Sequence, residues 1–175
     1  MKFISDIRLL LLGLWLGAAV FFIVAAQVAF AVLPERELAG ALVGRNLSIL
    51  NFAGLGIAVI LLVTSIVGSA IVNKIWLWVE RFLLVVLGAA CAVGQFVIGY
   101  WLSAVRAQMG RPIDELAADD PLRAQFNTLH EYSTWIFLAA MAAALITFFI
   151  ITNRTFNRVK AADTGVYDFS KEFKV

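Results

Sequence analysis

Chemically reactive side chains are scarce in this sequence. Its 175 residues include one histidine, His130, and one cysteine, Cys91. A single cysteine excludes a disulfide within the chain and any cysteine-based metal motif. The sequence also has no phosphate loop, dinucleotide fingerprint or metalloprotease motif. We therefore expect no catalytic residues, no bound metal and no cofactor, and we predict that the protein is not an enzyme.

Charge is scarce as well. Charged residues make up 15% of the chain, against about 25% in a soluble domain. Hydrophobic residues make up 62%, more than the roughly 45–50% that a soluble fold carries. The basic residues lie near the ends of apolar stretches and form no stripe, so we expect no nucleic-acid partner. This composition indicates an integral membrane protein whose main surroundings are the lipid bilayer.

Four apolar stretches are long enough to cross a membrane, which takes about 20 residues of helix. They cover residues 9–33, 47–72, 82–105 and 126–152. The first apolar run, of about 25 residues, exceeds the 7–15 of a signal peptide, so we interpret it as an uncleaved anchor. We predict an all-α membrane protein, an antiparallel bundle of four transmembrane helices in residues 1–153, with a polar tail over 154–175.

Residues typical of helix starts and turns, together with the distribution of lysine and arginine, predict the topology. Pro34 and Asp120-Pro121 are typical of helix starts, and Asn73 is predicted to make a tight turn. Lysine and arginine prefer the cytoplasmic side, so we expect both termini and the Asn73 turn to be cytoplasmic. Nine of the 14 basic residues lie on that side: Lys2, Arg8, Lys74, Arg81, Arg154, Arg158, Lys160, Lys171 and Lys174.

Polar residues inside the expected spans are the candidate functional residues, because they are costly in lipid. All lie in the half of the bundle away from the termini, and we expect them to form a polar layer there. They are Gln27, Asn51, Gln95, Asn127, His130, Glu131 and Ser133. Hydrogen bonding between helices explains such a layer without a ligand. A ligand or ion site and a contact surface for a partner stay open as alternatives.

Small residues predict where the helices approach closely. Gly13 and Gly17 form a GxxxG pair in the first span, and Gly54 and Gly56 narrow the second. On the third span, Gly88 and Cys91 belong to a small-residue face. Since lipid removes the hydrophobic force between helices, such faces favour packing inside the bundle.

Several motifs resemble a known family. They are Leu14–Phe22, Ala39-Gly40, Val93–Gln95, Met109–Asp114, Asp120–Arg123 and Phe126–Ser133. Together they resemble a bacterial membrane family, a domain of unknown function, related to eukaryotic transmembrane protein 205. The resemblance implies a four-helix fold in the bacterial inner membrane, and it gives weight to Arg123, His130 and Ser133. Where members often carry asparagine, this chain has Phe137.

Three functions are consistent with these observations. The first is a structural or accessory subunit of a membrane complex, joined to other membrane subunits or to copies of itself. The second is a transporter or binder of a small solute or metal ion that uses the polar layer. The third is a haem protein, although one histidine excludes bis-histidine ligation within the chain. An enzymatic function is the weakest hypothesis, because Ser133 and His130 have no evident acidic residue to orient the histidine.

Overall fold

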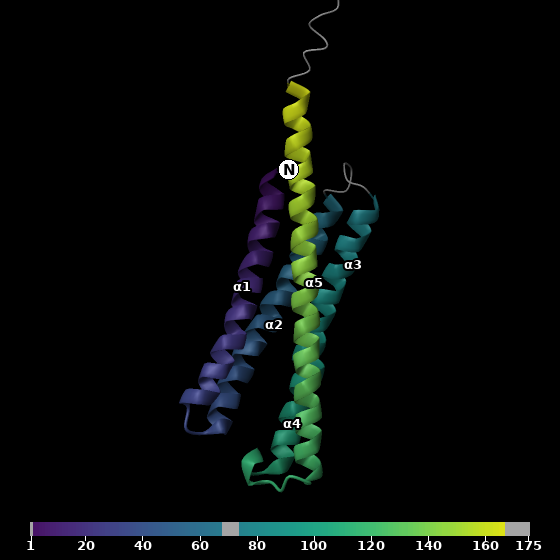
Figure 1. The fold of residues 1–175 in the computed structure, drawn as a ribbon. Helices are drawn as coiled ribbons and strands as arrows, with labels where there is room; N and C mark the ends of the chain where they lie inside the picture. The colour runs from purple at the N-terminus through teal and green to yellow at the C-terminus, as the bar shows by residue number, and fades with distance from the viewer. Residues whose placement is uncertain (1, 68–73, 167–175) are drawn as a thin grey trace, which may run out of the picture.

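The computed structural model describes residues 2–67 and 74–166, and within them it contains helices and no strand (Figure 1). The long helices are α1 (Lys2–Val32), α2 (Arg36–Val67), α3 (Lys74–Ala92) and α5 (Pro121–Val166). A π-helical segment, η2 (Val93–Ile98), joins α3 to α4 (Gly99–Met109), and a 3-10 turn, η3 (Ile113–Glu115), follows.

Four helical stretches are long and apolar enough to cross a membrane, which confirms the predicted number of spans. They cover Phe3–Val32, Arg36–Ile66, Lys74–Met109 and Pro121–Arg154. The third combines α3, η2 and α4 into one crossing. At about 1.5 Å per residue, each stretch exceeds the ~30 Å hydrocarbon core, so their ends extend into the headgroup regions.

The helix ends follow the local sequence signals closely. The helix α5 begins at Pro121 as predicted, and the Asp120 carboxylate accepts a hydrogen bond from the Leu122 amide at 2.8 Å. The helix α2 begins at Arg36, two residues after the predicted start at Pro34. Pro34 lies in a bend instead. Gly110 ends α4 in the left-handed region, with φ of 63°. The predicted turn at Asn73 lies outside the described residues.

The two ends of the bundle differ in shape (Figure 1). We call the end with the start of α1, the start of α3 and the later part of α5 the terminal end. The opposite end, with the α1–α2 connection and the α4–α5 connection, is called the loop end. The helices lie together toward the terminal end, whereas α1 and α2 diverge from α4 and α5 toward the loop end.

The core runs along the middle of the bundle, and its tightest contact joins α1, α2 and α3. The Trp15 indole donates a hydrogen bond to the Leu50 carbonyl at 2.9 Å. A Cβ on Gly54 would lie 2.6 Å from the Cys91 sulfur and 2.8 Å from the Trp15 nitrogen. Glycine is therefore required at position 54. Gly54, Gly88 and Cys91 pack inside the bundle as expected, whereas Gly56 is exposed.

Contrary to the prediction, the two glycines of the GxxxG pair of α1 do not both pack inside the bundle. A Cβ on Gly13 would meet the Phe148 ring at 3.7 Å, an ordinary packing distance. Gly17 is exposed, and nothing lies within 4 Å of a Cβ built there. Only the first glycine of the pair thus faces the interior, and Gly17 lines a shallow apolar groove between α1 and α5.

Candidate functional site

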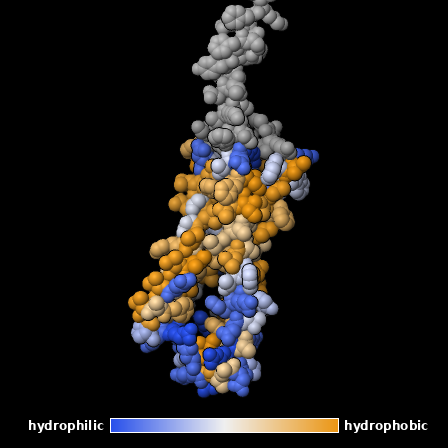
Figure 2. Space-filling view, viewed as in Figure 1, coloured by the Kyte–Doolittle hydropathy of each residue, from blue (hydrophilic) through white to orange (hydrophobic). Residues whose placement is uncertain are grey.

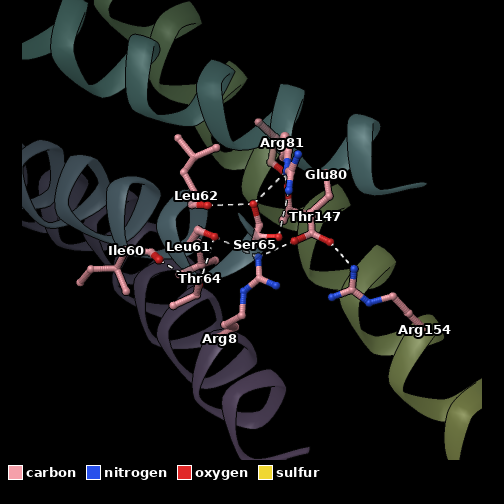
Figure 3. Close-up of polar contacts among 11 residues, drawn as sticks. Arg8, Ile60, Leu61, Leu62, Thr64, Ser65, Glu80, Arg81, Thr147 and Arg154 are labelled. Carbon is pink, nitrogen blue, oxygen red and sulfur yellow. Dashed lines mark hydrogen bonds and ion pairs between the residues drawn. The ribbon is translucent and has the colours of Figure 1, made fainter. Parts of the chain in front are cut away.

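A buried cluster of charged side chains ties three helices together at the terminal end (Figure 3). Glu80 on α3 is fully buried, and it bridges Arg8 on α1 and Arg154 on α5. One Glu80 oxygen accepts a short hydrogen bond from the Arg8 guanidinium. The other accepts one from Arg154 at 2.6 Å. We call Arg8, Glu80 and Arg154 the ion cluster.

The remaining helix, α2, joins the ion cluster through its backbone. The Arg8 guanidinium donates to the Leu61 carbonyl at 3.2 Å. Beside it, Arg81 donates to the Ser65 hydroxyl at 3.1 Å and to the Ser65 carbonyl at 3.0 Å. All four crossing helices therefore meet in one polar network, although none of these contacts lies in the polar layer predicted from the sequence.

The ion cluster is not electrically balanced. It holds two guanidinium groups and one carboxylate, and Arg81 is paired only with the uncharged Ser65 among the described residues. The Arg8 side chain is 5% exposed, and its Nε atom has no hydrogen-bond partner within the described part of the chain. Buried charges are costly unless they are paired, so this excess of positive charge needs an explanation.

Glu80 is absent from the predicted site because the predicted third span begins at residue 82. The helix begins at Lys74, so Glu80 lies inside it. Arg8 and Arg154 were counted only as markers of the cytoplasmic side. A signal was nevertheless present, since Glu80 is the only acid between Glu37 and Asp114. In an antiparallel bundle, it lies at the same level as the first turns of α1 and the later turns of α5.

The predicted polar layer is not one buried cluster. Asn51 is buried against η2, where a Cβ on Gly94 would lie 3.2 Å from its side-chain nitrogen. Gln95 and Ser133 are half-buried. The other four residues are exposed at the surface of the chain: Gln27, Asn127, His130 and Glu131. In the described residues, Glu131 forms no ion pair with Arg45 or Arg106.

Aromatic and cationic groups gather on α4 and α5 at the loop end. The His130 ring stacks parallel to Phe126, with ring centroids 6.4 Å apart. The Arg106 guanidinium carbon lies 5.2 Å from the centroid of the same ring. Figure 2 shows hydrophilic side chains gathered at this end, around a hollow between the diverging pairs of helices. Phe126 thus contacts two exposed nitrogen-bearing side chains, one from α4 and one from its own helix.

Of the residues that the family resemblance emphasised, Arg123 has a clear structural contact. Its guanidinium donates to the Leu116 carbonyl at 2.8 Å and fastens the α4–α5 connection. An exposed ion pair of 3.0 Å between Arg36 and Asp114 joins the same connection to the start of α2. Phe137, the residue in place of the family's asparagine, is buried and packs edge-on against Phe22 at 5.5 Å.

The described residues offer no cluster of three or more histidine, cysteine or acidic side chains that could hold a metal ion. His130 has aromatic and cationic neighbours rather than further ligands.

Comparison with protein families matches residues 10–111 to a domain of unknown function, DUF4149. The chain belongs to this family. The match covers more than half of the sequence and includes Glu80, but it stops before Arg123, His130 and Ser133. No curated protein and no solved structure matches the chain. The predicted membership of a family of unknown function is confirmed; the relation to transmembrane protein 205 stays a prediction.

Proposed function

We propose that this DUF4149 protein is a non-enzymatic accessory subunit of a complex in the bacterial inner membrane. Its loop end would supply the surface that contacts another membrane chain. The supporting observation is that Gln27, Asn127 and His130 lie exposed on helices that are long enough to cross the membrane. Polar groups facing lipid are costly, and a partner chain that hydrogen-bonds to them would offset this cost.

The contrast between the two ends supports the same assignment. At the terminal end, Glu80, Arg8, Arg81 and Arg154 form hydrogen bonds that connect α1, α2, α3 and α5. At the loop end, α1 and α2 diverge from α4 and α5 (Figure 1), and Gln27, Asn127 and His130 are exposed. A subunit that is internally fixed at one end and open at the other is suited to receiving a partner helix at the open end.

Site-specific photocrosslinking in the native membrane would test this proposal. A photoreactive residue at Gln27 or His130 should form a crosslink to a second protein chain, identified by mass spectrometry. Val59 and Phe149 are matched controls, because they are exposed apolar residues of crossing helices, 52% and 57% exposed. They should crosslink mainly to lipid. Equal protein crosslinking at all four positions, or none at Gln27 and His130, would refute the proposal.

A second candidate function is binding of a small solute at the loop end. It is favoured by the hollow in Figure 2 and by the exposed Arg106 and His130 side chains on the Phe126 ring. Native mass spectrometry of the gently extracted protein should then show a retained small mass. His130→Ala should lose that mass with little change in thermal stability, because the side chain is exposed. A retained mass that is unchanged in His130→Ala would exclude this site.

We also propose that the terminal end faces the cytoplasm. Arg8, Lys74, Arg81 and Arg154 lie at this end, in keeping with the preference of basic residues for the cytoplasmic side. Exposed aromatic residues support the positions of the two membrane boundaries. Trp76 and Trp78 mark the terminal end, and a second group marks the loop end: Tyr100, Trp101, Tyr132 and Trp135.

A further inference from the structure

The unbalanced charge of the ion cluster points to a ligand that carries negative charge. Glu80 is shared between Arg8 and Arg154, so one positive charge is left over after pairing. Arg81, one residue further on α3, contributes another, because its partner Ser65 is neutral. The Nε atom of the buried Arg8 has no hydrogen-bond partner among the residues that the structure describes.

Only one part of the ion cluster can be reached from outside. Glu80 is fully buried and the Arg8 side chain is 5% exposed, whereas the Arg154 side chain is 17% exposed. A ligand would therefore meet the guanidinium of Arg154 first. Arginine suits this role, because its planar fork presents several N–H donors and can bind a carboxylate and a phosphate oxygen at once.

The depth of the ion cluster identifies the class of ligand. Trp76 and Trp78 lie within one turn of Glu80 on α3 and are 55% and 66% exposed. Exposed tryptophans of transmembrane helices lie at the level of the lipid headgroups. The anions present at that level are headgroup phosphates, and basic sites between transmembrane helices bind such groups.

We propose that the DUF4149 protein binds the headgroup phosphate of an anionic phospholipid at Arg154, on the exposed edge of the ion cluster. Arg154 donates to the phosphate with the N–H groups that do not contact Glu80. Arg8 and Arg81 add positive potential from behind. The lipid then neutralises the excess charge and holds α5 against α1 and α3 at the membrane boundary.

Native mass spectrometry of the full-length protein would test this site. The protein is exchanged into detergent containing either phosphatidylglycerol or phosphatidylcholine, and the fraction that retains lipid is measured at increasing collision energy. Retention of phosphatidylglycerol should be about tenfold greater than that of phosphatidylcholine. It should also persist in millimolar inorganic phosphate. Equal retention of the two lipids, or displacement by inorganic phosphate, would overturn the proposal.

Two substitutions within the ion cluster should change lipid retention in opposite directions. Arg154→Gln removes the contacting cation and should lower retention of phosphatidylglycerol about tenfold. Glu80→Gln removes the competing carboxylate while keeping the side-chain volume, and it should raise retention severalfold. Both variants break the same ion pair, so a loss of folding would lower retention in both. A fall in both variants, or no change in either, would contradict the proposal.

Lys74→Gln is the matched control for diffuse attraction. Lys74 is an exposed cation at the same end, and it forms no ion pair with any of the described residues. Its loss should change retention less than threefold. If Lys74→Gln lowers retention as much as Arg154→Gln, the attraction is a general property of the basic surface and there is no site at Arg154.

Discussion

The ion cluster predicts a specific order of stability among its variants. Glu80 bridges two arginines, so its replacement by leucine leaves Arg8 and Arg154 without a counter-charge. Removing one partner of a buried ion pair typically costs about 3–5 kcal/mol. Arg8→Met leaves the 2.6 Å contact between Glu80 and Arg154 intact. It should therefore cost less, about 1.5–3 kcal/mol for the lost hydrogen bond to a charged group.

The double variant Arg8→Met/Glu80→Leu separates charge from packing. It removes the buried charge pair and fills the space with apolar atoms, a change that is often neutral or stabilising. Arg154 is partly exposed and can turn its guanidinium toward water or headgroups. We expect the double variant to be more stable than Glu80→Leu alone by about 2 kcal/mol or more, within the range measured for coupled neighbours.

Equilibrium unfolding in mixed micelles, followed by circular dichroism, would give these free energies. The unfolding of wild type, the two single variants and the double variant forms a double-mutant cycle. The predicted order of stability is wrong if Glu80→Leu costs less than about 1 kcal/mol, the value of an exposed pair. It is also refuted if the two single costs simply add, because additivity would mean that Arg8 and Glu80 do not interact.

Two further predictions concern packing and topology. Gly54→Ala should destabilise the bundle by about 1–3 kcal/mol through overpacking, whereas Gly17→Ala should change its stability by less than about 0.5 kcal/mol. Unfolding in mixed micelles measures both free energies. Equal effects of the two substitutions would contradict the close contact at Gly54. In a Cys91→Ala background, a membrane-impermeant thiol reagent should label Lys74→Cys only from the cytoplasmic side and Gln108→Cys only from the opposite side. Labelling of both from one side would exclude a membrane crossing by the stretch Lys74–Met109.

The number of membrane crossings could be predicted because apolar length and the position of proline are local signals. The start of α5 at Pro121 follows from Asp120 and Pro121 alone. The burial of Gly54 and Cys91 could also be anticipated from residue size. In each case, the physical cause lies within a few residues of sequence, or in a composition that lipid selects strongly.

The ion cluster could not be predicted in the same way, because it depends on the relative heights of three helices. Arg8, Glu80 and Arg154 each lie near an edge of an apolar stretch, where a charged residue can simply face headgroups. Only the packing of α1, α3 and α5 shows that Glu80 is turned inward. The prediction that the polar layer forms a buried cluster was wrong, because four of its residues are exposed. The predicted similar depth of Gln27 and His130 rests on their position along the helices, and that position does not fix the direction in which a side chain points.

The family match covers only part of the ion cluster. Residues 10–111 contain Glu80 but neither Arg8 nor Arg154. A fully buried carboxylate in that segment would be very costly without cations, so the segment depends on arginines from both sides of it. The first turns of α1 and the fourth crossing are therefore part of the same folding unit as the matched domain. Any fragment that ends at residue 111 would leave Glu80 without its Arg154 partner and should not keep the packing of α3 described here.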